Sequence, residues 1–287
     1  MLLGEWLETW LSLYVDPSGL AENTKACYHR AVHAVPTALA SQDMSALSPL
    51  HLMDWLVSVA RKHPRAAQLD RVMLSKALRV AYKLGMCPGC VIDHDTLPKP
   101  PHRPKQTQIL TIAEAQVYLI AARSSPCYPL LALCLCGLRR GEALGARWTD
   151  LEDGYLMVRR QRQRVHHAYQ AVPLKTARSA RGILLPSKLR RELEAWPRSI
   201  TGWICDATPE QLQREHKRVL QACGLPDVTL HGLRHTFATA AAVQGRPMKH
   251  LQMALGHTKV KMTADLYADH LSPLSDLPAQ VWQENAM

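Results

Sequence analysis

Six residues in the second half of the chain combine the groups needed to cleave a phosphodiester bond. They are Arg139, Lys175, His231, Arg234, His257 and Tyr267. Cleavage by a protein nucleophile requires neutralisation of the non-bridging oxygens and a proton for the leaving oxygen. Arginine suits the first task, because its planar guanidinium makes two parallel hydrogen bonds to an oxyanion and stays protonated. We therefore expect the two arginines to bind the scissile phosphate, with the two histidines as further donors.

The nucleophile of this set is Tyr267, the one phenol that follows the histidines. A phenol has an unperturbed pKa of about 10, so it is a weak nucleophile at neutral pH unless cations surround it. The arginines and the lysine supply those cations. The sequence therefore indicates attack by a tyrosine on a phosphate.

Two spacings in the sequence predict how some of these side chains are held. His231 and Arg234 are three residues apart, so on a helix both project from one face. Glu142 follows Arg139 by the same interval, and we expect its carboxylate to orient that guanidinium rather than to act as a base. Arg140 is a rival for the role of Arg139, but the spacing to Glu142 favours Arg139.

The sequence around these residues resembles the catalytic domain of the tyrosine recombinases, the phage-integrase and Xer family. The similar segments are GLRRGEAL, PLKTARSARGILLP, LHGLRHTFAT and LGHTKVKMTADLY, and the similarity extends from about Ile109 to Tyr267. The resemblance implies that Arg139 is the family's first arginine, Lys175 its β-hairpin lysine and Tyr267 its nucleophile. It further implies that His231 and Arg234 form the H-x-x-R pair and that His257 is the histidine of the LGH motif.

The resemblance also implies a reaction. Attack by the tyrosine gives a 3′-phosphotyrosyl enzyme and a free 5′-hydroxyl, and Lys175, at the tip of a hairpin, is the expected acid for the leaving 5′-oxygen. Because the phosphotyrosine conserves bond energy, rejoining requires no nucleotide. The sequence contains no Walker-type loop and no cluster of carboxylates suited to a divalent metal, so we expect neither a cofactor nor a metal.

Composition favours a polyanionic partner and an intracellular location. The chain has 287 residues, 35 Lys and Arg against 24 Asp and Glu, a formal net charge of +11 and a pI near 9.4. The N-terminal sequence MLLGEWLETW lacks the basic region of a signal peptide, and the longest apolar stretch, 128–138, is too short to cross a bilayer. Eight scattered cysteines fit a reducing compartment, so we expect a cytoplasmic protein without membrane contact.

A proline-rich segment divides the chain. Residues 97–105 read LPKPPHRPK, and proline excludes both helix and central strand. We expect a helical domain at 1–97, a linker at 98–108, a catalytic domain at 109–270 and a tail at 271–287. The family resemblance assigns the first domain to DNA core binding, and the apolar tail docks either on its own domain or on a neighbouring protomer.

The predicted fold class is mainly α with a small antiparallel β-sheet. Apolar stripes at helical spacing predict a bundle of four or five helices before the linker. The first stripe is Trp6, Trp10, Leu13 and Tyr14. The last is Leu69, Val72, Met73, Ala77, Val80, Ala81 and Leu84, and it is closed by Gly85. Thr111 and Glu114 form a capping box that begins a helix through about Ala122. Asp153-Gly154 is a hairpin signal, and we expect one three-stranded sheet from residues 155–161, 169–174 and 181–185.

Basic and hydroxyl side chains outside the six are candidates for DNA contact, although a solvated surface explains any one of them equally well. These candidates are Thr24, Lys25, Arg30, Arg140, Arg160, Arg162, Arg178, Arg181, Lys259 and Lys261.

These features together favour a site-specific DNA recombinase that integrates or excises a mobile element. The resemblance implies double-stranded DNA with an inverted-repeat core site as substrate, a homotetramer acting through a Holliday junction, and room for accessory proteins. The same residues also fit two alternatives. One is Xer-type resolution of replicon dimers, and the other is nicking and rejoining of DNA in the manner of a type IB topoisomerase. A non-catalytic DNA-binding regulator is a third, which the complete set of six residues disfavours.

Overall fold

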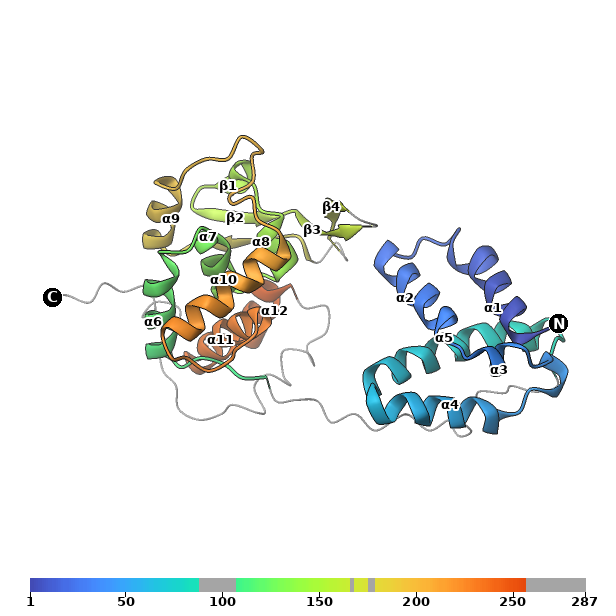
Figure 1. Ribbon diagram of the computed structural model, residues 1–287. Coiled ribbons are helices and arrows are strands. Elements are labelled where there is room, and N and C mark those ends of the chain that lie inside the picture. The colour runs from blue at the N-terminus through green and yellow to red at the C-terminus, as the bar shows by residue number, and fades with distance from the viewer. Residues whose placement is uncertain (88–106, 166–167, 175–178, 257–287) are drawn as a thin grey trace. The chain divides into compact units, whose positions relative to one another are not determined.

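The structure is a computed structural model that describes residues 1–87, 107–165, 168–174 and 179–256 (Figure 1). The chain divides into two compact units, Met1–Lys105 and Gln106–Met287, and each has its own apolar core. The architecture is mainly helical with small antiparallel sheets, as the sequence predicts. Within the described ranges, no helix is both long enough and apolar enough to span a membrane.

The described part of the first unit is helical. Its elements are α1 (Leu3–Trp10), a π-helical turn (Leu11–Val15), α2 (Glu22–His33), α3 (Thr37–Ala40), a 3₁₀ turn (Met44–Ala46), α4 (Pro49–Lys62) and α5 (Pro64–Lys83). Gly85 follows α5 with φ +71°, which confirms the predicted left-handed end of this helix.

Two of the expected apolar stripes in this unit are partly wrong. Leu13 and Tyr14 are exposed, while Leu11 and Val15 are buried in their place, because the π-helical turn rotates the chain relative to an α-helix. In α5, the row of Met73, Ala77 and Ala81 is buried as expected. Leu69 and Val72 are exposed, because at about 100° per residue both project away from the centre of the buried face, which also contains Ala67, Asp70, Leu74 and Leu78.

The second unit contains seven helices within the described ranges. They are α6 (Ile112–Ala122), α7 (Tyr128–Leu135), α8 (Arg140–Leu144), α9 (Ser187–Glu194), α10 (Pro209–Ala222), α11 (Leu230–Val243) and α12 (Met248–Leu255). The predicted capping box of α6 is present, with Thr111 N donating to Glu114 Oε2 at 2.7 Å and Glu114 N to Thr111 Oγ1 at 3.3 Å. Every residue of α7 is buried, and α11 packs against it, so these two helices form the centre of the unit.

The prediction of a single three-stranded sheet was wrong. Strands β1 (Leu151–Glu152), β2 (Tyr155–Val158) and β5 (Arg181–Leu184) form one antiparallel sheet, and β3 (Arg160–Val165) pairs only with β4 (Ala168–Pro173). The expected strand 155–161 is interrupted at Arg159, and its two halves pair with different partners. Asp153 and Gly154 both have positive φ in the turn between β1 and β2, which confirms the predicted hairpin.

The expected position of Lys175 at the tip of a hairpin stays a prediction. The residue lies outside the described residues, in the connection between β4 and β5, and these two strands are not partners in the described sheets.

Candidate active site

Glu142 lies at the centre of the candidate active site. It is the third residue of the short helix α8 and is 3% exposed. Its Oε2 accepts a hydrogen bond from the backbone N–H of Arg139 at 2.9 Å, which satisfies a donor at the start of the helix. Its Oε1 accepts from Nη1 of the same arginine at 2.6 Å, so the proximity predicted from the spacing is present.

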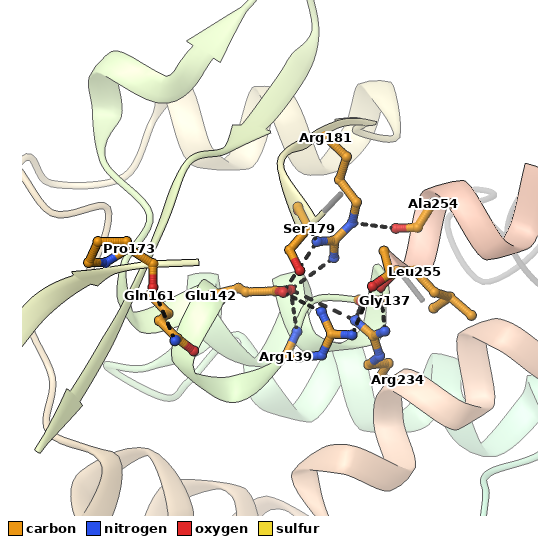
Figure 2. Close-up of polar contacts among 11 residues, drawn as sticks. Gly137, Arg139, Glu142, Gln161, Pro173, Ser179, Arg181, Arg234, Ala254 and Leu255 are labelled. Carbon is orange, nitrogen blue, oxygen red and sulfur yellow. Dashed lines mark hydrogen bonds and ion pairs between the residues drawn. The ribbon is translucent and has the colours of Figure 1, made fainter. Parts of the chain in front are cut away.

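Two further arginines from distant parts of the chain surround the same carboxylate (Figure 2). Arg181, the first residue of β5, donates from Nη2 to Oε2 at 2.8 Å and from Nη1 to Oε1 at 3.2 Å. Arg234, from α11, has Nη1 3.8 Å from Oε2. One carboxylate thus faces three guanidinium groups, which leaves an excess of positive charge suited to an oxyanion.

The pKa values of the cluster reflect competition between burial and charge. Burial alone would raise the pKa of Glu142, but the hydrogen bonds and charges of Arg181 and Arg139 outweigh it and hold that pKa below its usual value. Burial, followed by the positive charge of Arg139, lowers the pKa of Arg234 to about 9, while Glu142 acts in the opposite direction. The carboxylate is therefore ionised and the guanidinium protonated at neutral pH.

The C-terminal end of α12 faces the same three arginines. Gly256 ends the helix with φ +61°, and the last carbonyls of a helix have no partner within it and lie at its negative pole. Each of the three carbonyls of residues 254–256 accepts a hydrogen bond from a different arginine. The pairs are Arg181 Nε with Ala254 O at 2.6 Å, Arg234 Nη2 with Leu255 O, and Arg139 Nη2 with Gly256 O at 3.1 Å.

His231 lies in the first turn of α11, three residues before Arg234. Thr229 is the N-cap of this helix and accepts a hydrogen bond from Gly232 N at 2.9 Å. The imidazole is exposed, and its ring meets that of His235 edge to face with centroids 4.5 Å apart. Desolvation of the imidazole by nearby protein atoms lowers the pKa of His231, and the charges of Arg234 and Arg139 lower it further. A neutral ring at physiological pH retains one N–H donor for an oxyanion.

A buried histidine fixes the chain immediately before α11. His216 of α10 donates from Nε2 to Val228 O at 2.6 Å, and its Nδ1 lies 2.8 Å from the hydroxyl of Tyr118. Because a carbonyl can only accept, the proton is on Nε2, and the phenol donates to Nδ1. At the other end of the site, Gly137 O accepts from Arg234 Nη1 at 2.7 Å. Helices α6, α7 and α10 therefore position the residues of α11.

The predicted DNA contacts in α2 are Thr24, Lys25 and Arg30. Lys25 Nζ donates to Asp16 O at 2.9 Å and pairs with Glu22 at 3.0 Å, and Arg30 is exposed. These contacts leave the side chains on the surface of the first unit.

The candidates in the second unit differ in environment. Arg140 is exposed at the start of α8, Arg160 bonds the buried Asp150, and Arg162 pairs with Asp206 at 2.8 Å. Arg181 has a side chain only 6% exposed, with its donors directed at Glu142 and α12. The donors of Arg181 therefore point to the interior of the site, and its expected contact with DNA stays a prediction.

Six of the predicted residues lie outside the described residues: Lys175, Arg178, His257, Lys259, Lys261 and Tyr267. The structure thus brings Arg139, Glu142, His231 and Arg234 together, and the sequence places His257 directly after Gly256. In the described part of the chain, no group of three or more His, Cys, Asp or Glu side chains is arranged to hold a metal ion.

The contacts that the sequence did not predict are mostly made by backbone atoms. The carbonyls of residues 254–256 and of Gly137 accept from the arginines, and any residue type has such a carbonyl. The glycine of the LGH segment is the one available signal, because glycine often ends a helix in the left-handed conformation. The link between Arg181 and Glu142 joins positions 39 residues apart, without a spacing pattern to reveal it.

Comparison with known proteins agrees with this geometry. Residues 105–272, more than half of the chain, match the Phage integrase family. A tyrosine recombinase XerC-like protein of Caldanaerobacter subterraneus is 27% identical over 62% of this chain and 54% of its own length, so the chain spans about half of that relative. Tyrosine recombinase XerC of Agrobacterium fabrum is 28% identical over 89% and 87% of the two chains, and the integrase of Mycobacterium phage L5 is 26% identical over 89% and 73%.

Solved structures share the fold. The Tn1549 transposon integrase in complex with a circular intermediate DNA has a TM-score of 0.77 at 20% identity, covering 95% of this chain and 96% of that one. A lambda integrase in a tetramer bound to a Holliday junction has a TM-score of 0.69 at 21% identity, covering 100% and 80%. With more than half of its residues matched to the family, the chain belongs to the phage integrase family of tyrosine recombinases.

Proposed function

We propose that the protein is a site-specific DNA recombinase that breaks and rejoins DNA through a 3′-phosphotyrosyl intermediate. The observation that carries the proposal is the group of three guanidinium groups around the buried carboxylate of Glu142, with His231 close enough for the charges of Arg234 and Arg139 to lower its pKa. Such an arrangement is preorganised to bind a phosphate whose negative charge increases during reaction. Membership of the phage integrase family supports the same reaction.

In the proposed mechanism, Arg139 and Arg234 bind the non-bridging oxygens of the scissile phosphate, and His231 and His257 add donors. The Oη of Tyr267 loses its proton to solvent, favoured by the surrounding cations, and forms a bond to phosphorus as the bond from phosphorus to the 5′-oxygen breaks. Lys175 gives that 5′-oxygen a proton. Rejoining is the reverse, with a 5′-hydroxyl displacing the tyrosine. Each preorganised donor contributes roughly 3–4 kcal/mol to such a transition state.

The two units have separate roles in this proposal. Residues 1–97 form the core-binding domain, 98–108 the linker and 109–270 the catalytic domain, with 271–287 as a tail that docks in cis or in trans. The substrate is a double-stranded core site with inverted repeats, bound by a homotetramer. The tetramer is supported by the similar fold of lambda integrase, which forms a tetramer bound to a Holliday junction. Accessory proteins are compatible with this assembly.

We propose integration and excision of a mobile element as the biological role, which the integrase-like GLRRGEAL and PLKTARSARG segments and the similarity to a phage integrase support. Resolution of replicon dimers is the second candidate, supported by the similarity to XerC over nearly the whole chain.

A recombination assay tests the reaction class. Plasmids carrying core sites taken from DNA that flanks the gene are incubated with the protein, alone and in pairs. The proposal predicts recombinant products only when two sites are present. Relaxation of supercoiled DNA without a site would instead indicate a type IB topoisomerase activity, and binding without any strand breakage would indicate a regulator.

A further inference from the structure

Arg181 is almost fully occupied by contacts within the protein. Its Nε donates to Ala254 O at 2.6 Å, its Nη1 to Ser179 O at 3.0 Å and to Glu142 Oε1 at 3.2 Å, and its Nη2 to Glu142 Oε2 at 2.8 Å. A guanidinium has five N–H groups, so four of them are used here. With one remaining donor, Arg181 cannot make the two parallel hydrogen bonds by which a guanidinium binds a phosphate.

The two arginines proposed to bind the phosphate are held differently. Within the described ranges, the guanidinium of Arg139 makes two hydrogen bonds, to Glu142 and Gly256, and its side chain is 34% exposed. The guanidinium of Arg234 makes two, to the carbonyls of Gly137 and Leu255. Each of these groups has more donors left than Arg181.

We propose that Arg181 is a positioning residue for the recombination reaction: it holds Glu142 and the C-terminal end of α12, and thereby sets the guanidinium groups of Arg139 and Arg234. The inference rests on the proposed function. Arg181 begins β5, the strand that follows the Lys175 connection, and it binds the helix that immediately precedes His257 in sequence. Arg181 thus connects the start of β5, which follows the segment with the proposed acid Lys175, to the end of α12, which precedes the second histidine, His257.

The packing of Gly256 supports this role. A Cβ atom at this position would lie 3.1 Å from Arg181 Nη1 and 3.4 Å from its Cδ and Cζ, so the glycine allows the guanidinium to approach the end of α12. The same residue has φ +61°, which ends the helix and turns its carbonyl toward Arg139. Glycine therefore serves both the helix end and the contact with Arg181.

The geometry requires the fork of an arginine. Nη2 and Nη1 address both oxygens of Glu142 while Nε addresses α12, and a lysine ammonium cannot reach all three acceptors in one plane. Without Arg181, only Arg139 and Arg234 remain to neutralise the carboxylate of Glu142. Their N–H donors then turn toward Glu142 and away from the phosphate. We therefore expect a loss in the rate of cleavage and little change in affinity for DNA.

The test compares Arg181→Lys and Arg181→Ala with Arg123→Ala, which removes an arginine–carboxylate pair, with Glu192, away from the site. Formation of the covalent adduct on a nicked core duplex is measured at saturating protein, and DNA affinity is measured across salt concentrations. We expect Arg181→Ala to slow adduct formation about 10- to 100-fold, the range for residues that orient others in a site, and Arg181→Lys to slow it less. Arg123→Ala should keep the wild-type rate.

Salt dependence separates positioning from phosphate binding. Loss of one phosphate contact reduces the slope of log affinity against log salt by about 0.9, whereas a positioning role leaves the slope unchanged. Added methylguanidinium should partly restore the rate of Arg181→Ala, because it fits the space between Glu142 and Ala254 O, and should not accelerate Arg123→Ala. If Arg181→Ala does not fold, the rate and the slope of Arg181→Lys decide the matter.

Several results would overturn the inference. A reduced slope with a normal cleavage rate at saturation would make Arg181 a phosphate contact, and wild-type rates in the folded variants would remove any role. Both results presuppose that the wild-type protein forms the adduct and Tyr267→Phe does not. If the wild-type protein, like Tyr267→Phe, forms no adduct on any duplex taken from the DNA that flanks the gene, the proposed function itself fails.

Discussion

Replacing Glu142 by glutamine removes the single negative charge from the centre of the site. The carboxylate is 3% exposed and lies within 4 Å of nitrogen atoms of Arg139, Arg181 and Arg234. The amide retains one oxygen that can accept from the backbone N–H of Arg139, so the local fold of α8 has a substitute acceptor. The three guanidinium groups, in contrast, lose their counter-ion.

The expected loss of stability follows from this burial. Removing one partner of a buried ion pair costs about 3–5 kcal/mol, because the other charge is left uncompensated. For a unit of this size, each kcal/mol lowers Tm by roughly 2–4 °C, so Tm should fall by about 6–20 °C. Because the folded-state pKa of Glu142 is lowered, its stabilisation is fully present above its unfolded pKa of about 4.3 and is lost as pH falls through the folded-state value.

Thermal and urea unfolding of Glu142→Gln at pH 7 measures this loss. The control is Glu194→Gln, which removes an exposed pair with Arg190 at 3.7 Å and should cost less than about 1 kcal/mol. Sulfate provides a second readout, since the unpaired arginines should bind an oxyanion. At equal ionic strength, sulfate should raise the Tm of Glu142→Gln above its value in chloride by more than it does for the wild type.

Two results would contradict the expected behaviour of Glu142→Gln. Equal small losses in Glu142→Gln and Glu194→Gln would mean that the buried carboxylate does not stabilise the arginine cluster. A large loss with no preferential response to sulfate would mean that the released guanidinium groups do not form an anion site.

Three further predictions concern positions that the structure or the chemistry singles out. Because burial lowers the folded-state pKa of His216, stability should be constant above the unfolded pKa of about 6.5 and fall as pH decreases below it; unfolding between pH 7.5 and 5 should show this slope, and His216→Phe should reduce it. Gly137→Ala should destabilise the protein by about 1–3 kcal/mol, because φ is +93° and the new Cβ would lie 2.8 Å from Phe237; Gly224→Ala, with φ +61° and open space, should cost less in the same urea titration, and equal losses would exclude the clash. Lys175→Ala should slow cleavage of ordinary DNA but not of DNA with sulfur at the bridging 5′ position, since a thiolate leaves without an acid; equal defects on both substrates would remove Lys175 from that role.

Local features of this protein could be predicted from the sequence, because they depend on neighbouring residues. The capping box of Thr111 and Glu114 follows from a spacing of three, as does the contact between Arg139 and Glu142. The turn at Asp153-Gly154 follows from residue types that tolerate positive φ.

Features that depend on distant partners could not be predicted in this way. At Arg159 the chain leaves one sheet and enters another, because β2 and β3 pair with different strands. The composition of these strands does not show which partner each one takes. Arg181 was expected at the DNA surface because its charge is visible in the sequence, while its contacts with Glu142 and Ala254 exist only in the folded chain. Apart from Gly256, which marks the end of α12, the bonds from arginines to the carbonyls of residues 254–256 leave no trace in residue type.

Covalent trapping tests whether Tyr267 attacks a phosphate held by Arg139 and Arg234. Nicked duplexes tiled across DNA that flanks the gene are incubated with wild-type protein and with Tyr267→Phe, then separated on a denaturing gel. We expect a protein–DNA band with the wild type alone, while both proteins bind the same duplex with similar affinity. A band of equal intensity with Tyr267→Phe would show that Tyr267 is not the nucleophile.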